Sequence, residues 1–252
     1  MDRQEVKKQF GTNADAYVTS KVHAKGASLE RLIELTNPQR DWQVLDVATG
    51  AGHTALAFAP FVAHVVASDI TPEMLQKTAV LAQQRNIQNL TTQEADAEAL
   101  PFPDAWFDCV TCRIAPHHFP RIDRFVQEAS RILKPGGLLA VVDNVVPEGE
   151  AGEFVNAFEK LRDPSHCRCL SITEWEKNFK QAGLEILHSE TLDKSMEFTP
   201  WAERMVKDDA LVEQIREMLI HAPADARAFL QPSATEPLMF RLVEGIFVGK
   251  RP

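Results

Sequence analysis

The pattern of apolar and polar positions divides the chain into a helical start and a longer region of alternating elements. In residues 1–40, Leu29, Leu32 and Leu35 recur at helical spacing, and the sequence NPQRD ends that pattern. After residue 41, short apolar runs alternate with segments of helical periodicity. This alternation predicts an α/β protein with a parallel sheet, because parallel strands must be joined by crossover helices.

Five apolar runs predict the strands of that sheet. They cover residues 42–48, 64–69, 89–96, 106–113 and 138–144. Helices are expected at 53–60, at 71–86 with Thr71 as N-cap and Pro72 first, and at 122–133 before the sequence KPGG. Such sheets bind ligands at the carboxyl ends of their strands, so we expect the site in the loops that follow these runs.

The regular alternation of predicted strands and helices ends after residue 145, although nothing in the composition marks a domain boundary. Residues 147–170 form a polar insertion with helical portions, and 173–183 predict a helix. Residues 184–192 and 238–251 predict two further strands, with helices near 200–230 between them. We therefore expect one domain over 1–252, with a helical cap at 1–40, a core at 41–145 and a third region at 146–252.

Composition and charge narrow the classes of function. Of the 252 residues 44% are hydrophobic and 25% charged, and the formal net charge is -9. Nucleic acid is not an expected partner, because phosphate binding needs a basic face. We expect no membrane span, since no apolar run approaches ~20 residues. The polar N-terminus lacks a signal-peptide core, and four cysteines make no disulfide scaffold, so we expect a cytoplasmic protein.

A glycine pair after the first strand predicts a nucleotide-like ligand. The residues from Gly50 through Gly52 to Ala55 fit the pattern G-x-G-x-x-G/A, in which glycines let the backbone approach a ligand. Asp69 ends the second strand, where a carboxylate can accept hydrogen bonds from ribose hydroxyls. A tight turn without any ligand is the alternative interpretation.

Asp46, inside the first strand, separates two ligand classes. A buried carboxylate is costly unless it is paired, and it would repel the pyrophosphate of a dinucleotide. A dinucleotide site would favour an apolar residue at this position. The positive charges of S-adenosylmethionine, a sulfonium and an ammonium, would be attracted by Asp46. The residues therefore favour S-adenosylmethionine over NAD.

Four segments of the chain carry a resemblance to a known family. The sequences VLDVATGAG, VVASDITPEML, EADAEALPFPDAWFDCVTCRIAPHHF and EASRILKPGGLLAVVD resemble the motifs of class I S-adenosylmethionine-dependent methyltransferases, in order, over residues 43–143. The chain looks most similar to the branch that includes the ubiquinone and menaquinone C-methyltransferases. The resemblance implies a Rossmann-like, doubly wound, mostly parallel seven-stranded sheet with an antiparallel last strand.

The resemblance also implies residues that hold the cofactor. Asp69 would bind the ribose, Ile70 and Met74 would lie beside the adenine, and the Arg113 carbonyl would receive the methionine amino group. Ala48 replaces the first glycine of the family motif, and its methyl group should be tolerated if the residue keeps a negative φ. The full expected set is Tyr17, Asp46, Ala48, Gly50, Gly52, Asp69, Ile70, Met74, Asp96, Ala97 and Arg113.

Histidines after the fourth strand are candidates for acceptor chemistry. His117 and His118 are expected to have near-neutral pKa values, so either could take a proton from a methyl acceptor. A loop with one packed and one exposed histidine is the alternative.

Further acceptor contacts are expected from His23, Arg162 and His166. Arg162 could bind an acceptor carboxylate, or could instead pair with Asp163 inside its loop. His23 could belong to a plain surface helix. The C-x-C pair Cys167 and Cys169 lacks zinc-site spacing, so no metal is expected.

The function expected from these observations is methyl transfer by an SN2 reaction to a small-molecule acceptor. The donor is already activated, so the protein would mainly align the reactants and exclude water. The alternative is a protein that binds S-adenosylmethionine without transferring its methyl group, since fold alone does not establish activity.

Overall fold

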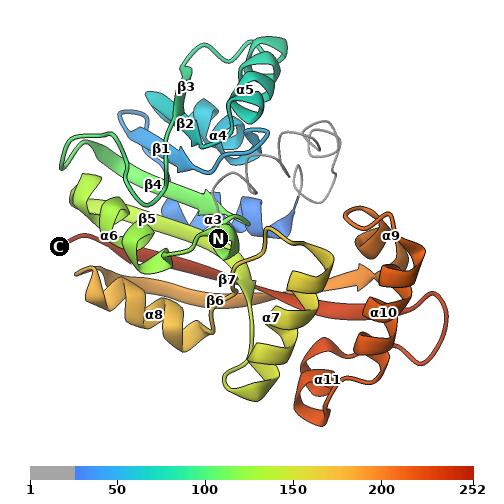
Figure 1. The fold of residues 1–252 in the computed structure, drawn as a ribbon. Helices are drawn as coiled ribbons and strands as arrows, with labels where there is room; N and C mark the ends of the chain where they lie inside the picture. Colours follow the sequence, from blue (N-terminus) through green and yellow to red (C-terminus); the bar gives the residue numbers. More distant parts are fainter. Residues whose placement is uncertain (1–25) are drawn as a thin grey trace.

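A seven-stranded sheet forms the centre of the protein (Figure 1). The computed structural model describes residues 26–252. The strands are β1 (Gln43–Val47), β2 (His64–Asp69), β3 (Leu90–Glu94), β4 (Phe107–Arg113), β5 (Leu133–Val145), β6 (Glu185–Glu197) and β7 (Met239–Lys250). The helices are α3 (Ala27–Thr36), α4 (His53–Phe58), α5 (Pro72–Gln84), α6 (Ile122–Ile132), α7 (Glu150–Arg162), α8 (Ile172–Gln181), α9 (Phe198–Glu203), α10 (Asp209–Ile220) and α11 (Ala224–Leu230), with short 3₁₀ turns η1 (Ala59–Phe61) and η2 (Pro116–His118).

The strand order is β3-β2-β1-β4-β5-β7-β6. Neighbouring strands from β3 to β5 pair in parallel, whereas β7 pairs antiparallel with both β5 and β6. The predicted mostly parallel sheet with an antiparallel last strand is confirmed. The order of the chain reverses beside β1, so the carboxyl ends of β1 and β4 border the switch point at which such sheets bind ligands.

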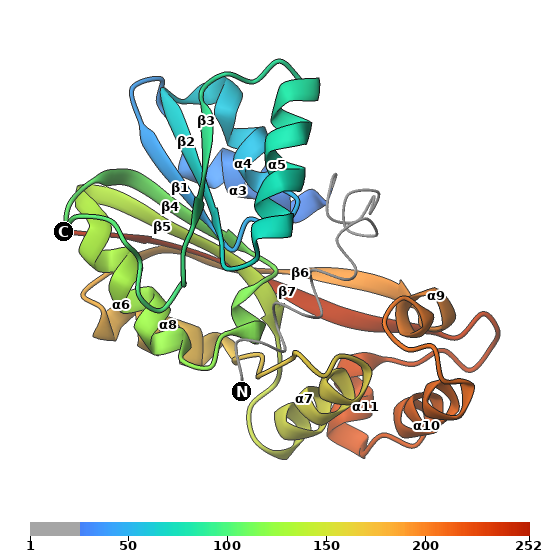
Figure 2. The same cartoon turned by 45° about the horizontal axis from the view of Figure 1, so that its top comes forward.

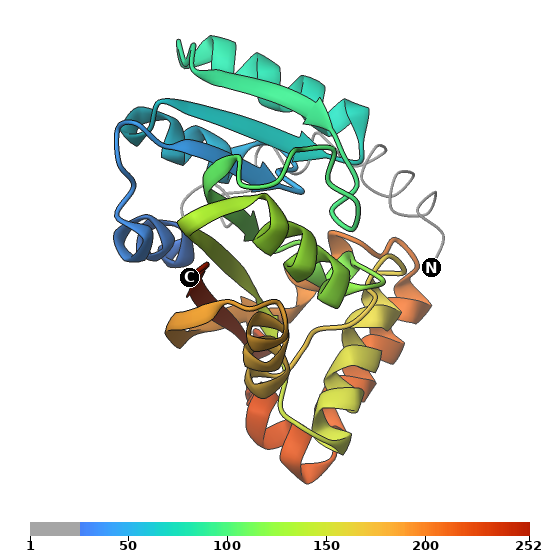
Figure 3. The same cartoon turned by 90° about the vertical axis from the view of Figure 1, so that its left-hand side faces the viewer.

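Side chains of the central strands alternate between two apolar layers. Val110 of β4 and Val141 of β5 lie in a core with helices α6 and α8 on one face. Their neighbours in the chain, Cys109 of β4 and Val142 of β5, point to the other face and lie in a second core with helices α3 and α4. Both faces are covered, so the strands consist of nearly continuous apolar runs rather than alternating ones. Figure 3 shows the helices on both sides of the sheet.

Two strands are longer than the sequence predicted. Strand β5 begins at Leu133 rather than at residue 138, and exposed Pro135 and Gly136 lie within it. The pairing of β4 with β5 shifts register between Phe107 and Cys109 at this place. Strand β6 continues to Glu197, beyond the expected end at residue 192, because β7 pairs with it along its whole length.

The chain after β5 builds a separate apolar core. The ribbon of β6 and β7 continues past the last pairing of β5, between Val145 and Val243. Helices α7, α9, α10 and α11 pack on this ribbon, and Phe158, Trp201 and Leu219 are buried in their core (Figure 2). This helical part lies beside the carboxyl ends of the strands, where the third region of the chain was expected to contribute.

No helix within residues 26–252 is long and apolar enough to cross a membrane.

Candidate functional site

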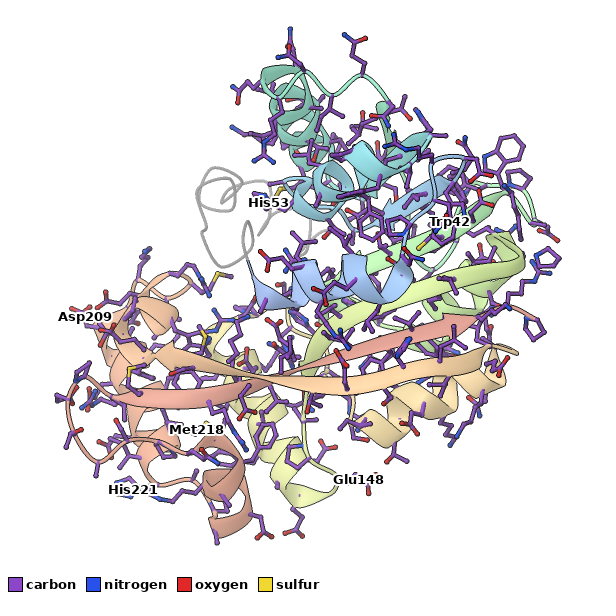
Figure 4. All side chains as sticks on the ribbon, turned by 180° about the vertical axis from the view of Figure 1, so that it is seen from behind. Trp42, His53, Glu148, Asp209, Met218 and His221 are labelled. Carbon is purple, nitrogen blue, oxygen red and sulfur yellow. The ribbon has the colours of Figure 1, made fainter. Side chains whose placement is uncertain are left out.

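A cleft with a volume of about 140 Å³ opens at the carboxyl ends of β1, β2 and β4. The turn after β1, the start of α5, the segment after β3 and the segment after β4 form its walls. Its lining residues are Ala48, Thr49, Gly50, Ala51, His53, Thr54, Asp69, Ile70, Thr71, Met74, Ala95, Asp96, Ala97, Glu98, Arg113, Ile114, Ala115, His118, Phe119 and Pro120. In Figure 4, His53 and Trp42 mark the two ends of the β1 region, and His53 is at the cleft end.

The glycine turn after β1 depends on two left-handed residues. Gly50 has φ +54° and Gly52 has φ +83°. A Cβ atom on Gly52 would lie 2.6 Å from Cγ2 of Thr78, whereas one on Gly50 would meet nothing within 4 Å. The Thr78 hydroxyl donates to the Gly50 carbonyl at 2.9 Å. Glycine is therefore favoured at Gly52 by both conformation and space, and at Gly50 by conformation alone.

Asp69 connects the end of β2 to the glycine turn. Its Oδ2 accepts a hydrogen bond from the Gly50 N–H at 2.9 Å, and its Oδ1 accepts one from the Thr71 N–H at 2.9 Å. Burial raises the pKa of Asp69, although these hydrogen bonds act in the opposite direction. The carboxylate lines the cleft. It can therefore accept further hydrogen bonds from a ligand while bracing the turn.

Asp46 lies behind the cleft and does not line it. One carboxylate oxygen accepts from the Thr49 hydroxyl at 2.6 Å and the Ala55 N–H at 3.1 Å, and the other from the Thr111 hydroxyl at 2.7 Å. Burial raises its pKa to about 6, against the effect of these hydrogen bonds. The carboxylate thus holds β1, β4 and the start of α4 together below the ligand turn, and any attraction for a cation in the cleft acts without direct contact.

Ala48 does not meet the condition under which its methyl group was expected to be tolerated without strain. Its φ is +51°, in the left-handed region rather than negative. A left-handed L-residue other than glycine costs about 1–2 kcal/mol. The turn after β1 therefore keeps the backbone shape that a glycine would take, and the alanine carries strain at the wall of the cleft.

The remaining expected cofactor residues of the described range meet at the same cleft. Ile70, Met74 and Ala97 lie in its wall. Asp96 also lines it, and its Oδ1 accepts from the Glu98 N–H at 2.9 Å. Tyr17 and His23 lie outside the described residues.

Arg113 reaches the cleft from the end of β4. Its Nε donates to the Thr54 hydroxyl at 3.1 Å, which ties β4 to the first turn of α4. Burial lowers the pKa of Arg113, and the carboxylates of Glu244 and Asp46 partly oppose this effect. A guanidinium remains charged even so. The methionine end of the expected cofactor would therefore meet one buried positive charge as well as polar backbone groups.

The two histidines after β4 have different environments. His117 does not line the cleft, and its Nδ1–H donates to Oδ1 of the buried Asp143 at 2.6 Å. His118 lines the cleft, and its Nδ1–H donates to the Ser165 carbonyl at 3.0 Å. The planes of the two rings are tilted by 46° relative to each other, and their centroids lie 4.1 Å apart.

The pKa values of His117 and His118 shift in opposite directions, as their different environments lead one to expect. Burial acts to lower the pKa of His117, but the charge and hydrogen bond of Asp143, helped by Glu159 and Asp163, raise it. Burial and the neighbouring charge of His117 lower the pKa of His118 to about 3. The expectation of near-neutral values is wrong for His118. The ring at the cleft is neutral at physiological pH, and the ring whose pKa is raised lies behind it.

Arg162 and His166 do not reach the cleft. The Arg162 guanidinium stacks on Trp201, 4.4 Å from the ring centroid, and pairs with Glu159 at 3.3 Å rather than with Asp163. His166 Nε2 lies 3.0 Å from the Asn156 side-chain oxygen, and burial with the nearby charge of His117 lowers its pKa to about 2. Both residues lie in the wall behind His117, because the loop after α7 folds back on η2.

Comparison with known proteins identifies the family. A family model described as "Methyltransferase domain" matches residues 45–141. The uncharacterized methyltransferase YcgJ of Bacillus subtilis (strain 168) is 38% identical over 219 residues, which are 86% of this chain and 87% of that protein. The chain belongs to the methyltransferase family. It is an S-adenosylmethionine-dependent methyltransferase with the Rossmann-like fold described above.

Solved structures agree with the family. BH2331 of Bacillus halodurans C-125 is 36% identical, with a TM-score of 0.86 over 90% of this chain and 100% of that chain. The YcgJ crystal structure is 35% identical, with a TM-score of 0.84 over 90% and 99%. A geranyl diphosphate methyltransferase solved with S-adenosylmethionine shares the fold, at 15% identity and a TM-score of 0.61 over 90% and 85%.

The methyltransferase cleft also contains residues that sequence reasoning missed. His53 and Thr54 follow the glycine pair directly, and Ile114 and Phe119 flank the two histidines. These residues could have been predicted from the sequence, because they lie next to the recognised motifs. Residues that follow the end of a strand line the same cleft as their neighbours in the chain. Within residues 26–252, no group of three or more His, Cys, Asp or Glu side chains is arranged to hold a metal ion.

Proposed function

We propose that this methyltransferase transfers the methyl group of S-adenosylmethionine to a small-molecule acceptor by an SN2 reaction. The observation that carries the proposal is a single cleft that joins the expected cofactor residues to His118 and Phe119. The cofactor residues and the histidine segment after β4 line the same cleft. The resemblance to the quinone C-methyltransferases supports an acceptor of metabolite size.

Residues of this chain fit the cofactor. The two left-handed glycines leave backbone room at the turn, and Asp69 presents acceptor oxygens at the cleft. Ile70, Met74 and Ala97 would surround the adenine, Asp96 would accept from its amino group, and Arg113 would hold the methionine end. When bound, S-adenosylmethionine supplies an activated methyl group on a sulfonium.

The protein's share of the reaction is alignment and exclusion of water. His118 would orient the acceptor through a neutral ring, and could receive a proton transiently. His117 would act behind it, because it does not line the cleft. Arg162 and His166 are further proposed acceptor-side residues. Neither lines the cleft, so they would act from the wall behind His117, where the buried Nε of Arg162 has no hydrogen-bond partner within the described residues. Tyr17 and His23 are proposed contacts from the N-terminal segment.

Thermal unfolding with added ligands tests the cofactor part of the proposal. S-adenosylmethionine and S-adenosylhomocysteine should raise Tm, by an amount equivalent to about 2.7 kcal/mol at 100-fold saturation. NAD and NADP should leave Tm unchanged, because the buried carboxylate of Asp46 disfavours a pyrophosphate. Equal stabilisation by NAD would contradict the cofactor.

Methyl transfer itself is tested by S-adenosylhomocysteine formation in a metabolite extract. We expect formation that depends on both the extract and the protein, and that is lost in a Gly52→Ala control that cannot build the turn. Binding of the cofactor with no product in fractions of any extract would support the alternative, a cofactor-binding protein without transferase activity. A high-molecular-weight acceptor fraction that alone gives product would contradict the small-molecule acceptor.

A further inference from the structure

Ile114, the first residue after β4, has a strained backbone. Its φ is +54°, and it is the β-branched residue among the six non-glycine residues of positive φ in the described range. For a β-branched side chain this conformation is a genuine outlier. Its own N–H donates to the Val142 carbonyl at 2.7 Å, so the strained residue is attached to β5 on its amino side.

The chain is anchored again three residues later. The backbone carbonyl of His117 accepts from the N–H groups of Cys167 at 2.8 Å and Arg168 at 3.1 Å. The His117 side chain donates to Asp143 at 2.6 Å. The left-handed residue thus lies between two fixed points, and these contacts must offset its backbone strain.

Asp143 is the innermost of these anchors. Its side chain has no exposed area, and it does not line the cleft. Within residues 26–252 its Oδ1 bonds to His117, whereas its Oδ2 has no hydrogen-bond partner. A buried carboxylate is costly unless it is paired. The contact with His117 is therefore the one through which Asp143 can influence the site.

The contact between Asp143 and His117 can influence the cleft through His118. The His118 ring packs against the His117 ring, with centroids 4.1 Å apart, and lines the cleft. On its other side, its Nδ1–H donates to the carbonyl of Ser165, whose hydroxyl donates to Asp163 at 2.6 Å. The orientation of His118 depends on where η2 is held, and η2 begins two residues after the strained position.

We propose that Asp143 is a positioning residue which, through His117, holds Ile114 in its left-handed conformation and so places the His118 ring at the cleft. Without this anchor, Ile114 relaxes toward the extended backbone that a β-branched residue prefers, and η2 moves with it. The functional meaning rests on the proposed function, because His118 faces a methyl acceptor only if methyl transfer occurs in this cleft.

The first experiment follows His118 by NMR in the full chain with ring-¹⁵N-labelled histidine. The wild type should show His118 as a single Nδ1–H tautomer. Asp143→Asn keeps the shape but removes the charge, and should split or shift the His118 resonances while the Kd of S-adenosylhomocysteine stays unchanged. The matched control is Asp108→Asn, at the opposite end of β4, where the carboxylate pairs with Lys134 at 2.8 Å. Unchanged His118 resonances in Asp143→Asn would overturn the proposal.

The second experiment measures the strain and does not require Asp143→Asn to fold. Ile114→Gly should fold more stably than Ile114→Ala, with a folding constant about two- to tenfold larger, because glycine takes a positive φ without strain. The control variant Ala151→Gly, in helix α7, should instead be less stable than the wild type. A glycine variant no more stable than Ile114→Ala would refute the strained hinge.

A double variant links the two observations. Ile114→Gly in the Asp143→Asn background should restore a single His118 resonance, because a glycine hinge no longer pulls η2 away. Failure of this rescue would separate the strain from the anchor and overturn the proposal. These spectra need no cofactor or acceptor. If ligand binding and product formation fail while the His118 response appears, the proposed function is wrong and the positioning role of Asp143 stands.

Discussion

Oδ2 of Asp69 lies 2.9 Å from the backbone nitrogen of Gly50, so one carboxylate joins the end of β2 to the ligand turn after β1. The sequence predicted Asp69 as a ligand for ribose hydroxyls. The structure adds a structural role, because the other oxygen accepts from Thr71 at the start of α5. Binding and stability are therefore coupled at this residue.

Replacement of Asp69 should affect both properties. Asp69→Ala removes two buried hydrogen bonds, and we expect a loss of about 1–3 kcal/mol in the free energy of unfolding without ligand. It should also weaken S-adenosylhomocysteine binding, since the turn and the ribose contact are lost together. Asp69→Asn keeps one acceptor oxygen and should lose less stability. Urea denaturation and calorimetric titration measure the two effects, and an Asp69→Ala variant of normal stability would contradict the bracing role.

Gly52 allows a direct comparison of space and conformation. Gly52→Ala places a methyl 2.6 Å from the Thr78 side chain at a φ of +83°. Gly183→Ala is the matched control, because its φ is +76° and a methyl there would meet nothing within 4 Å. The control should lose about 1–2 kcal/mol from backbone strain alone. Gly52→Ala should lose more stability and also its cofactor binding, and equal losses in urea denaturation would argue against a tight fit at Thr78.

The central strands were predictable because both their faces are buried. Apolar runs such as Val44 to Val47 are short and bounded by polar turns, so their positions follow from hydrophobicity alone. Strand β6 was predicted too short because it lies at the sheet edge, where residues alternate between exposed and half-buried positions. Its last five residues form a strand only through pairing with β7, which is distant in sequence.

The cofactor wall was predictable for a related reason. Residues such as Asp69 and Met74 occupy strand ends or the turns directly after them, and parallel topology brings those ends together. The acceptor side of the site was not predictable from the sequence, because the positions of Arg162 and His166 depend on contacts between loops. His166 is held by Asn156 of α7, and its neighbour Ser165 by His118, and neither contact leaves a local pattern in the sequence.

Ala48 offers a second test of backbone strain, at the wall of the cleft. Its φ of +51° matches the φ of +53° at Ala105, which lies in the turn before β4 and does not line the cleft. Glycine at either position removes about 1–2 kcal/mol of strain but adds about 0.4–1 kcal/mol of unfolded-state entropy. Ala48→Gly and Ala105→Gly should thus change stability similarly. Ala48→Gly alone should tighten S-adenosylhomocysteine binding, and a change in affinity at Ala105→Gly would contradict a local effect.

Asp46 should make cofactor affinity depend on pH. Burial raises its pKa to about 6, so the carboxyl is protonated below this pH and charged above it. The sulfonium of S-adenosylmethionine favours the charged form, so its affinity should increase as pH rises through about 6. The gain can reach at most about tenfold per pH unit for one coupled proton. S-adenosylhomocysteine lacks that charge and the methyl group, but it has the same adenosine and amino-acid groups.

The ratio of the two dissociation constants therefore isolates Asp46 from other titrating groups. In calorimetric titrations between pH 5 and 7.5, the affinity for S-adenosylmethionine should increase relative to the affinity for S-adenosylhomocysteine as pH rises. Asp46→Asn should give a ratio that does not change with pH, and urea denaturation of the same variant shows whether its network with Thr49 and Thr111 survives. Because Asp46 lies behind the cleft wall, its charge acts without contact, and the slope should stay below the limit for one proton. A ratio that is flat in the wild type would mean that the sulfonium does not sense Asp46, and that this carboxylate serves the fold alone.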